Sequence, residues 1–169
     1  MSYIETERLL LRTWMTSDAA PLAAIYGDPE TMQYILTGTK TLEQTREAIA
    51  KMVEADERDG CSLWPVVLKE SSELIGSCGL MKTEEPRVLE LGFVFAPAAR
   101  GKGYAIEAVR GVLDFGFKEL RARSVIALVH PFNAPSIALV NKLGMPFDRV
   151  VRMRRGNRGA DVLRYVRDA

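Results

Sequence analysis

The sequence has few of the residues that build disulfide frameworks or metal centres. It holds 2 cysteines and 1 histidine among 169 residues. Cys61 and Cys78 stand in apolar, strand-like runs, where a thiol usually serves as a small buried hydrophobe rather than a disulfide partner. His130 has no second histidine or paired cysteine nearby, so we expect no metal site and assign it a hydrogen bond at the end of a strand.

A charge imbalance and a long apolar run are also missing. The 23 lysines and arginines nearly balance the 22 aspartates and glutamates, so no overall field would gather nucleic acid or an anionic membrane. No window approaches the roughly 20 apolar residues of a membrane-spanning helix. Residues 1–5 lack the basic stretch followed by an apolar one that opens a secretion signal. We therefore expect a cytoplasmic protein that has no nucleic-acid and no membrane partner.

What the chain does have is enough apolar side chain for one core. Its 169 residues are 47% hydrophobic, and this length falls within the usual span of a single domain. No repeat, low-complexity tract or linker divides it. Strand-like and helix-like segments mix along the whole length, which predicts one α/β domain over residues 1–169 with a mixed sheet that starts antiparallel.

The periodicity of apolar residues predicts the individual elements. Thr41 and Gln44 form a capping-box pattern at the start of a helix that Gly60 ends. Other helices are expected over residues 19–26, from 29 onward, over 106–120 and over 135–143. Strands are expected over residues 7–14, 63–69, 74–82, 88–95, 124–130, 147–154 and 162–166.

A glycine turn joins the strand over 88–95 to the long helix that follows. Gly101 and Gly103 remove side chains there, so several backbone N–H groups can point at one anion near the positive helix end. A pyrophosphate fits such a turn, and a tight connection that needs glycine only for its backbone angles is the alternative. Gly103 stands where a Walker A loop needs serine or threonine, and Ile106 stands where a dinucleotide fingerprint needs glycine or alanine.

Residues 98–103, Ala-Ala-Arg-Gly-Lys-Gly, resemble the acetyl-CoA signature of the GNAT superfamily, Gln/Arg-x-x-Gly-x-Gly/Ala. Only the first position departs, because it is Ala98, and this removes one side-chain contact while the backbone donors stay. The order of further motifs resembles the RimJ/RimL branch, the ribosomal-protein N-terminal acetyltransferases and their relatives. Those motifs are residues 6–12, 90–93, 103–108, 133–136, 142–145 and 161–165.

The resemblance implies a GNAT fold, a single mixed, mostly antiparallel sheet with helices on both faces and a splayed central strand pair. It also implies an acetyl-CoA-dependent N-acetyltransferase. Such an enzyme would pass acetyl to a primary amine, on a protein N-terminus or a small molecule, by direct transfer in a ternary complex. The residues it assigns to the coenzyme are Phe93, Val94, Phe95, Arg100, Gly101, Lys102, Gly103, Tyr104, Ala105 and Asn133, of which residues 93–95 would act through their main chain.

Glu90 is the candidate general base, since it is a carboxylate in an otherwise apolar strand and burial raises a carboxyl pKa. A solvated residue on an alternating face is the alternative. A weak base favours α-amines, whose pKa near 8 makes neutralisation easier than for lysine near ~10.4. Many relatives carry a tyrosine as general acid where this chain has Val140, and the RimJ/RimL pattern points instead to Ser136. For Ser136 and Asn133, helix capping is the alternative role.

Four matters stay open in the sequence. Because of Ala98 and Val140, the alternative function is a GNAT-fold sensor or scaffold that holds an acyl-CoA without productive transfer. The acceptor pocket is expected around residues 26–40 and 83–87, which contain no readable motif, and a homodimer is compatible with the sequence. The arginine-rich end fits either a solvated hairpin near the coenzyme phosphates or a surface that attracts an acidic substrate. Its arginines are Arg149, Arg152, Arg154, Arg155, Arg158, Arg164 and Arg167.

Overall fold

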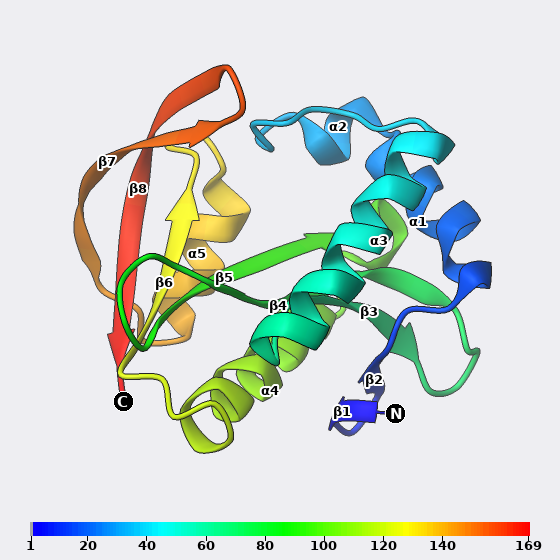
Figure 1. The fold of residues 1–169 in the computed structure, drawn as a ribbon, viewed down its shortest axis with the longest axis horizontal. Coiled ribbons are helices and arrows are strands. Elements are labelled where there is room, and N and C mark those ends of the chain that lie inside the picture. Colours follow the sequence, from blue (N-terminus) through cyan, green and yellow to red (C-terminus); the bar gives the residue numbers. More distant parts are fainter. Residues whose placement is uncertain (1) are drawn as a thin grey trace.

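In this computed structural model, which describes residues 2–169, eight strands join in one sheet (Figure 1). Their order across the sheet is β1-β2-β3-β4-β5-β6-β8-β7. Every neighbouring pair is antiparallel except β5 and β6, which run parallel. The strands are β1 Ser2–Glu5, β2 Leu9–Arg12, β3 Leu63–Leu68, β4 Leu74–Lys82, β5 Val88–Phe95, β6 Ser124–Val129, β7 Phe147–Arg155 and β8 Arg158–Asp168. The predicted mixed, mostly antiparallel sheet is confirmed.

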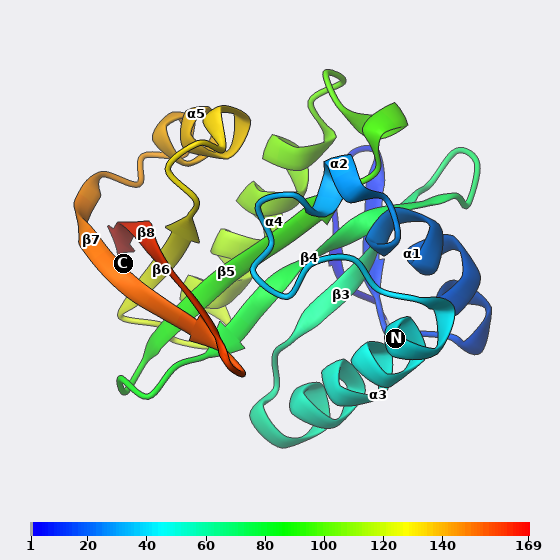
Figure 2. The same ribbon diagram turned by 90° about the horizontal axis from the view of Figure 1, so that it is seen from above.

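Helices cover both faces of the sheet, as Figure 2 shows with α4 on one side and α3 and α1 on the other. The helices are α1 Ala19–Tyr26, α2 Pro29–Met32, α3 Leu42–Asp59, α4 Tyr104–Lys118 and α5 Ala134–Lys142. The capping box of α3 is present as predicted, since Thr41 Oγ1 accepts from the Gln44 N–H at 3.2 Å and Gln44 Oε1 accepts from the Thr41 N–H at 2.9 Å.

Alternate residues of β5 divide the core between the two faces. Leu91 and Phe95 join the large cluster beneath α4, whereas Val94 packs against a smaller cluster that contains Leu22 and Tyr26 of α1. This alternation, with a period of two residues, is what a strand buried between two helical layers requires. The cysteines behave as the sequence predicts, because both are free and buried. Burial raises the pKa of the Cys61 thiol to about 11.

The central parallel pair separates along its length. β5 and β6 are paired from Val88↔Ser124 to Leu91↔Ala127. Beyond Leu91, β5 stays paired with β4 as far as Phe95, while β6 stays paired with β8 as far as Val129. The two strands therefore splay as predicted, and they leave an opening at the end of β5.

The structure differs from the predicted elements at the two ends of the sheet. The strand predicted over 7–14 is only β2, and the unpredicted β1 pairs with it. A turn separates the two, in which the Thr6 N–H donates to the Leu9 carbonyl at 3.0 Å. β8 is longer than the predicted 162–166, because it pairs with β7 up to Arg155↔Arg158 at the hairpin tip.

Candidate functional site

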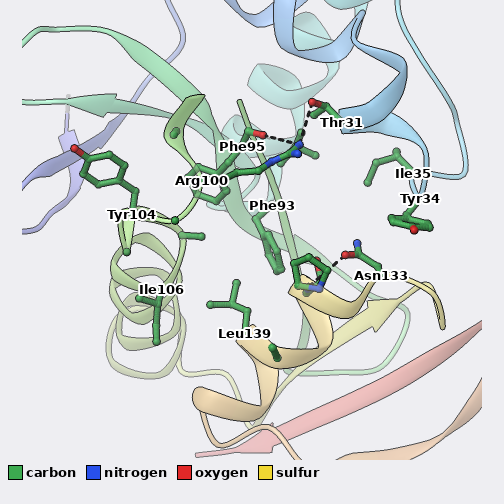
Figure 3. A pocket seen from close by; sticks show the side chains of 18 of the residues that line it. Thr31, Tyr34, Ile35, Phe93, Phe95, Arg100, Tyr104, Ile106, Asn133 and Leu139 are labelled. Atoms are coloured by element: carbon green, nitrogen blue, oxygen red, sulfur yellow. Dashed lines mark hydrogen bonds between the residues drawn. The ribbon is translucent and has the colours of Figure 1, made fainter. Parts of the chain in front are cut away.

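A cavity of about 450 Å³ occupies the opening between β5 and β6. Figure 3 shows Tyr104 and Ile106 on one side of it, Tyr34 and Ile35 on the other, and Phe93 between them. The lining includes Ser136 and every residue assigned to the coenzyme by resemblance except Lys102. We call this cavity the coenzyme cleft. Segments from β5, the glycine turn, α5 and the α2 region thus meet at one place.

The glycine turn needs glycine for backbone reasons at two positions. Gly101 has φ 73° and Gly103 has φ 79°, in the left-handed region that residues with side chains avoid. Gly103 is the residue that precedes the first turn of α4. The first N–H groups of a helix have no partner within the helix, and its N-terminal end is positive, so an anion is favoured here. The backbone angles therefore require both glycines, and this requirement is compatible with anion binding.

Arg100 is held in place across the cleft rather than left in solvent. Its guanidinium donates to Thr31 Oγ1 at 3.0 Å and to the Phe95 carbonyl at 3.5 Å. Figure 3 shows this side chain spanning from the glycine turn to Thr31. Arg100 thus links α2 to the turn that starts α4.

A second set of contacts supports the turn from the outside. Glu107, in the first turn of α4, accepts from the Thr6 hydroxyl at 2.6 Å, the Arg8 N–H at 2.8 Å and Arg8 Nε at 2.6 Å. Arg8 also donates to the Lys102 carbonyl at 2.9 Å. Burial raises the pKa of the Glu107 carboxyl, but the hydrogen bonds from Thr6 and Arg8 outweigh it, and the net pKa is lowered. Sequence analysis missed Glu107, whose signal was an acidic residue in the first turn of a helix.

Asn133 and Ser136 lie at the start of α5 and line the coenzyme cleft. Asn133 Oδ1 accepts from the Ser136 N–H at 3.3 Å, so Asn133 does cap the helix. The Ser136 assignment rests on the absence of a tyrosine one turn later, and the structure shows Val140 fully buried there. Capping uses one acceptor of Asn133 and the backbone of Ser136, which leaves the amide nitrogen of Asn133 and the Ser136 hydroxyl for a ligand.

Glu90 lies outside the coenzyme cleft. Its side chain, 16% exposed, forms an ion pair with Arg155 at 2.9 Å and lines a different cavity of about 650 Å³. Burial raises the pKa of its carboxyl, and Arg155 only partly opposes that shift. Val94 lies four residues further along β5, which corresponds to about 13 Å. A proton could reach Glu90 from the cleft only through intervening water.

A further cavity of about 490 Å³ adjoins the coenzyme cleft and shares Gln33, Tyr34 and Ile35 with it. We call it the acceptor cavity, because the acceptor pocket is expected around residues 26–40. His130 and, from the β7–β8 hairpin, Arg158 complete its polar lining together with Thr39. His130 Nδ1 accepts from the Phe132 N–H at 3.1 Å, which confirms its predicted hydrogen bond. Several residues between 29 and 39 contribute to this lining, whereas Thr83 and Glu84 line the cavity of Glu90.

Comparison with known proteins identifies the family of this chain. The sequence model described as the Acetyltransferase (GNAT) domain matches residues 8–146. The chain belongs to the GNAT acetyltransferase family. Its predicted superfamily, fold and enzyme class are thereby confirmed.

Two relatives and one solved structure are similar to this chain over most of its length. YkkB of Bacillus subtilis, an uncharacterized protein, is 36% identical over 150 residues, which cover 87% of each chain. YnaD of the same organism, called an uncharacterized N-acetyltransferase, is 34% identical over 143 residues, which cover 85% of this chain and 82% of YnaD. The crystal structure of a GNAT-family acetyltransferase from Bacillus anthracis is 32% identical with a TM-score of 0.87, covering 99% of this chain and 98% of that one.

Within residues 2–169, no helix is long and apolar enough to span a bilayer. Over the same range, no group of three or more histidine, cysteine, aspartate or glutamate side chains could hold a metal ion.

Proposed function

We propose that this GNAT acetyltransferase takes its acetyl group from acetyl-CoA and transfers it directly to a primary amine in a ternary complex. The observation that carries the proposal is the junction of two cavities at Gln33, Tyr34 and Ile35. One cavity ends at the glycine turn and the start of α4, and the other is enclosed by the hairpin and the α2 region. A donor and an acceptor bound in adjoining cavities need no covalent enzyme intermediate.

The coenzyme would bind chiefly to the main chain. Its pyrophosphate would lie against the N–H groups of residues 101–105, where both the glycine geometry and the helix end favour an anion. Its pantetheine arm would run along the edge of residues 93–95, whose backbone groups on the β6 side are released where the strands splay. Asn133, across the cleft, would contact the same arm through its amide nitrogen.

Two side chains would move protons in the transfer. Glu90 would accept the proton of the amine through water, and its raised pKa brings it nearer to the range a base needs. Ser136 would donate to the departing thiolate from its place in the cleft. Because such a base is weak, we propose α-amines as the preferred class, in line with the motif order shared with the RimJ/RimL branch.

A second candidate function is an acyl-CoA-binding protein without productive transfer. The buried Val140 in the place of the common acid and the pairing of Glu90 with Arg155 favour it. Release of free thiol from acetyl-CoA, measured with a panel of amines and peptides, distinguishes the two candidates. A ligand at 100 times its dissociation constant stabilises a protein by about 2.7 kcal/mol. A thermal shift with acetyl-CoA but no thiol release would establish the binding protein. If acetyl-CoA caused neither a thermal shift nor thiol release, both candidate functions would be rejected.

A further inference from the structure

The acceptor cavity is lined by hydrogen-bond donors and apolar groups but by no carboxylate. Its charged lining residue is Arg158, and no aspartate or glutamate belongs to the lining. On this basis, and resting on the proposed function, we propose that the acceptor is a primary amine that also carries a carboxylate, which Arg158 binds.

Arg158 differs from three nearby arginines of the hairpin in having no acidic partner among the described residues. Arg152, Arg155 and Arg164 each pair with a carboxylate. Arg158 has none within 4.0 Å among residues 2–169. Its guanidinium donates one hydrogen bond, at 3.3 Å, to the carbonyl of Leu36. Since a guanidinium carries five N–H donors, Arg158 is both held in place and able to bind a carboxylate in the bidentate manner.

The other polar residues of the cavity reinforce this preference. His130 Nδ1 accepts from the Phe132 N–H, so the proton of the neutral ring is on Nε2, which is then a donor. The ring of Tyr34 lies 5.0 Å from that of His130 and ends in a hydroxyl that can also donate. A carboxylate, which only accepts hydrogen bonds, suits this set of groups.

The same charges disfavour a polyamine or an aminoglycoside. A second ammonium close to Arg158 would be repelled by the like charge of its guanidinium. No lining carboxylate would offset that repulsion. Electrostatics near Arg158 therefore favours the binding of amines that carry a carboxylate over the binding of multiply charged amines.

The position of Arg158 also orients the acceptor. Tyr34 lines both cavities, whereas Arg158 lines only the acceptor cavity. With the carboxylate at Arg158, the amine would lie toward Tyr34 and the cleft. The cavity lining also contains apolar side chains, and its volume of about 490 Å³ is within the range of small-ligand sites. Its apolar members are Met32, Ile35, Leu36, Met153 and Val162.

The test compares acceptors with and without a carboxylate, and kcat/KM is expressed per neutral amine because a free α-carboxylate also raises the pKa of the neighbouring amine. Leucine is compared with leucinamide, and a peptide beginning Leu-Asp with one beginning Leu-Asn, so that a free α-carboxylate and an acidic side chain are separated. Spermidine is the multiply charged amine. We expect kcat/KM to favour the carboxylate member of at least one pair by about tenfold or more, which is 1.4 kcal/mol. Equal or better use of leucinamide, of the Asn peptide and of spermidine would overturn the proposal.

Variants of the hairpin connect the preference to Arg158. Arg158→Gln should abolish the carboxylate preference through a higher KM, and Arg158→Glu should reverse it. Arg154→Gln is the matched control, since Arg154 is exposed on the same hairpin and lines none of the three cavities. A preference that survives in Arg158→Gln, with an unchanged melting temperature, would reject the assignment.

Absence of acetyl transfer can be distinguished from absence of carboxylate binding at Arg158. If no amine is acetylated, titration calorimetry of the CoA-bound protein with leucine and leucinamide gives the readout. Tighter binding of leucine that Arg158→Gln abolishes would support the carboxylate site although the proposed transfer is wrong. Equal or absent binding of the two would overturn the site as well.

Discussion

The coenzyme cleft and the acceptor cavity are adjoining, yet they are built in different ways. One continuous segment, from Phe93 to Ile106, forms much of the cleft, and two glycines with positive φ set the backbone geometry of its turn. The acceptor cavity depends on side chains, among them Tyr34, His130 and Arg158, that come from distant parts of the chain. A main-chain site tolerates a changed side chain such as Ala98, whereas every substitution in a side-chain site alters what it recognises.

The arginines on the two sides show the same contrast. Arg8 and Arg100 form hydrogen bonds within the protein that stabilise the glycine turn. Arg158 makes one hydrogen bond to a carbonyl and keeps its charge uncompensated. The coenzyme side is thus preorganised by internal bonds, while the acceptor side keeps a charge for its ligand.

The largest effect should come from Glu90→Gln, which tests whether turnover can be lost without loss of coenzyme. A general base contributes roughly 10²–10⁴-fold, so we expect kcat to fall about 100-fold. The dissociation constant of acetyl-CoA should be unchanged, because Glu90 lies outside the cleft. Steady-state rates and titration calorimetry measure the two quantities.

Arg155→Met is the control, because it removes the ion pair and leaves the carboxylate. Arg155 lowers the pKa of Glu90, so its loss should raise that pKa further. Since a base must be deprotonated, the acidic limb of the kcat/KM profile should move to higher pH. Equal losses of kcat in the two variants at every pH would instead show that Glu90 acts by anchoring the hairpin.

A smaller effect is expected from Gly101→Val, which tests whether the cleft depends on its backbone. Gly60, at the end of α3, offers a matched site: both glycines have φ 73°, and a Cβ at either would meet nothing within 4 Å. Both valine variants should therefore lose similar stability. Only Gly101→Val should weaken acetyl-CoA binding, by about tenfold or more, as measured by calorimetry. Equal affinities in the two variants would contradict a main-chain cradle.

The smallest effect concerns the support beneath the turn. Glu107→Gln should lower the melting temperature by about 2 to 4 °C at neutral pH, as expected for loss of about 1 kcal/mol in a chain of this size. The pKa of Glu107 is lowered from 4.5, so the stability it contributes is present above pH 4.5. That stability is lost as the pH falls through the lower pKa of the folded state.

The difference in melting temperature between wild type and Glu107→Gln should therefore shrink below pH 4.5. Glu119→Gln, at an exposed position just after α4, is the control and should show little difference at any pH. A difference that stays constant as the pH falls would mean that the charge of Glu107 contributes nothing to stability.

Local sequence patterns predicted most elements and the coenzyme cleft, but not the partners of its residues. The predicted bounds of α1, β4 and β5 agree with the structure, because apolar periodicity and turn residues act over a few positions. The raised pKa of Glu90 was also predicted, since a carboxylate among apolar strand residues is buried. Its ion pair with Arg155, 65 residues away, was not. No local pattern specifies which distant side chain approaches a buried charge.

By itself, the sequence determined the kind of fold and most residues of the cleft in which we propose that the coenzyme binds, because glycine conformation, helix caps and strand alternation are local properties. The tertiary structure decided the acceptor side. Leu36 and Arg158 are 122 residues apart and meet only when the β7–β8 hairpin approaches the α2 region. Whether an arginine is paired or available depends on what lies within a few ångströms of its guanidinium, and only the packing of the whole chain brings those groups together.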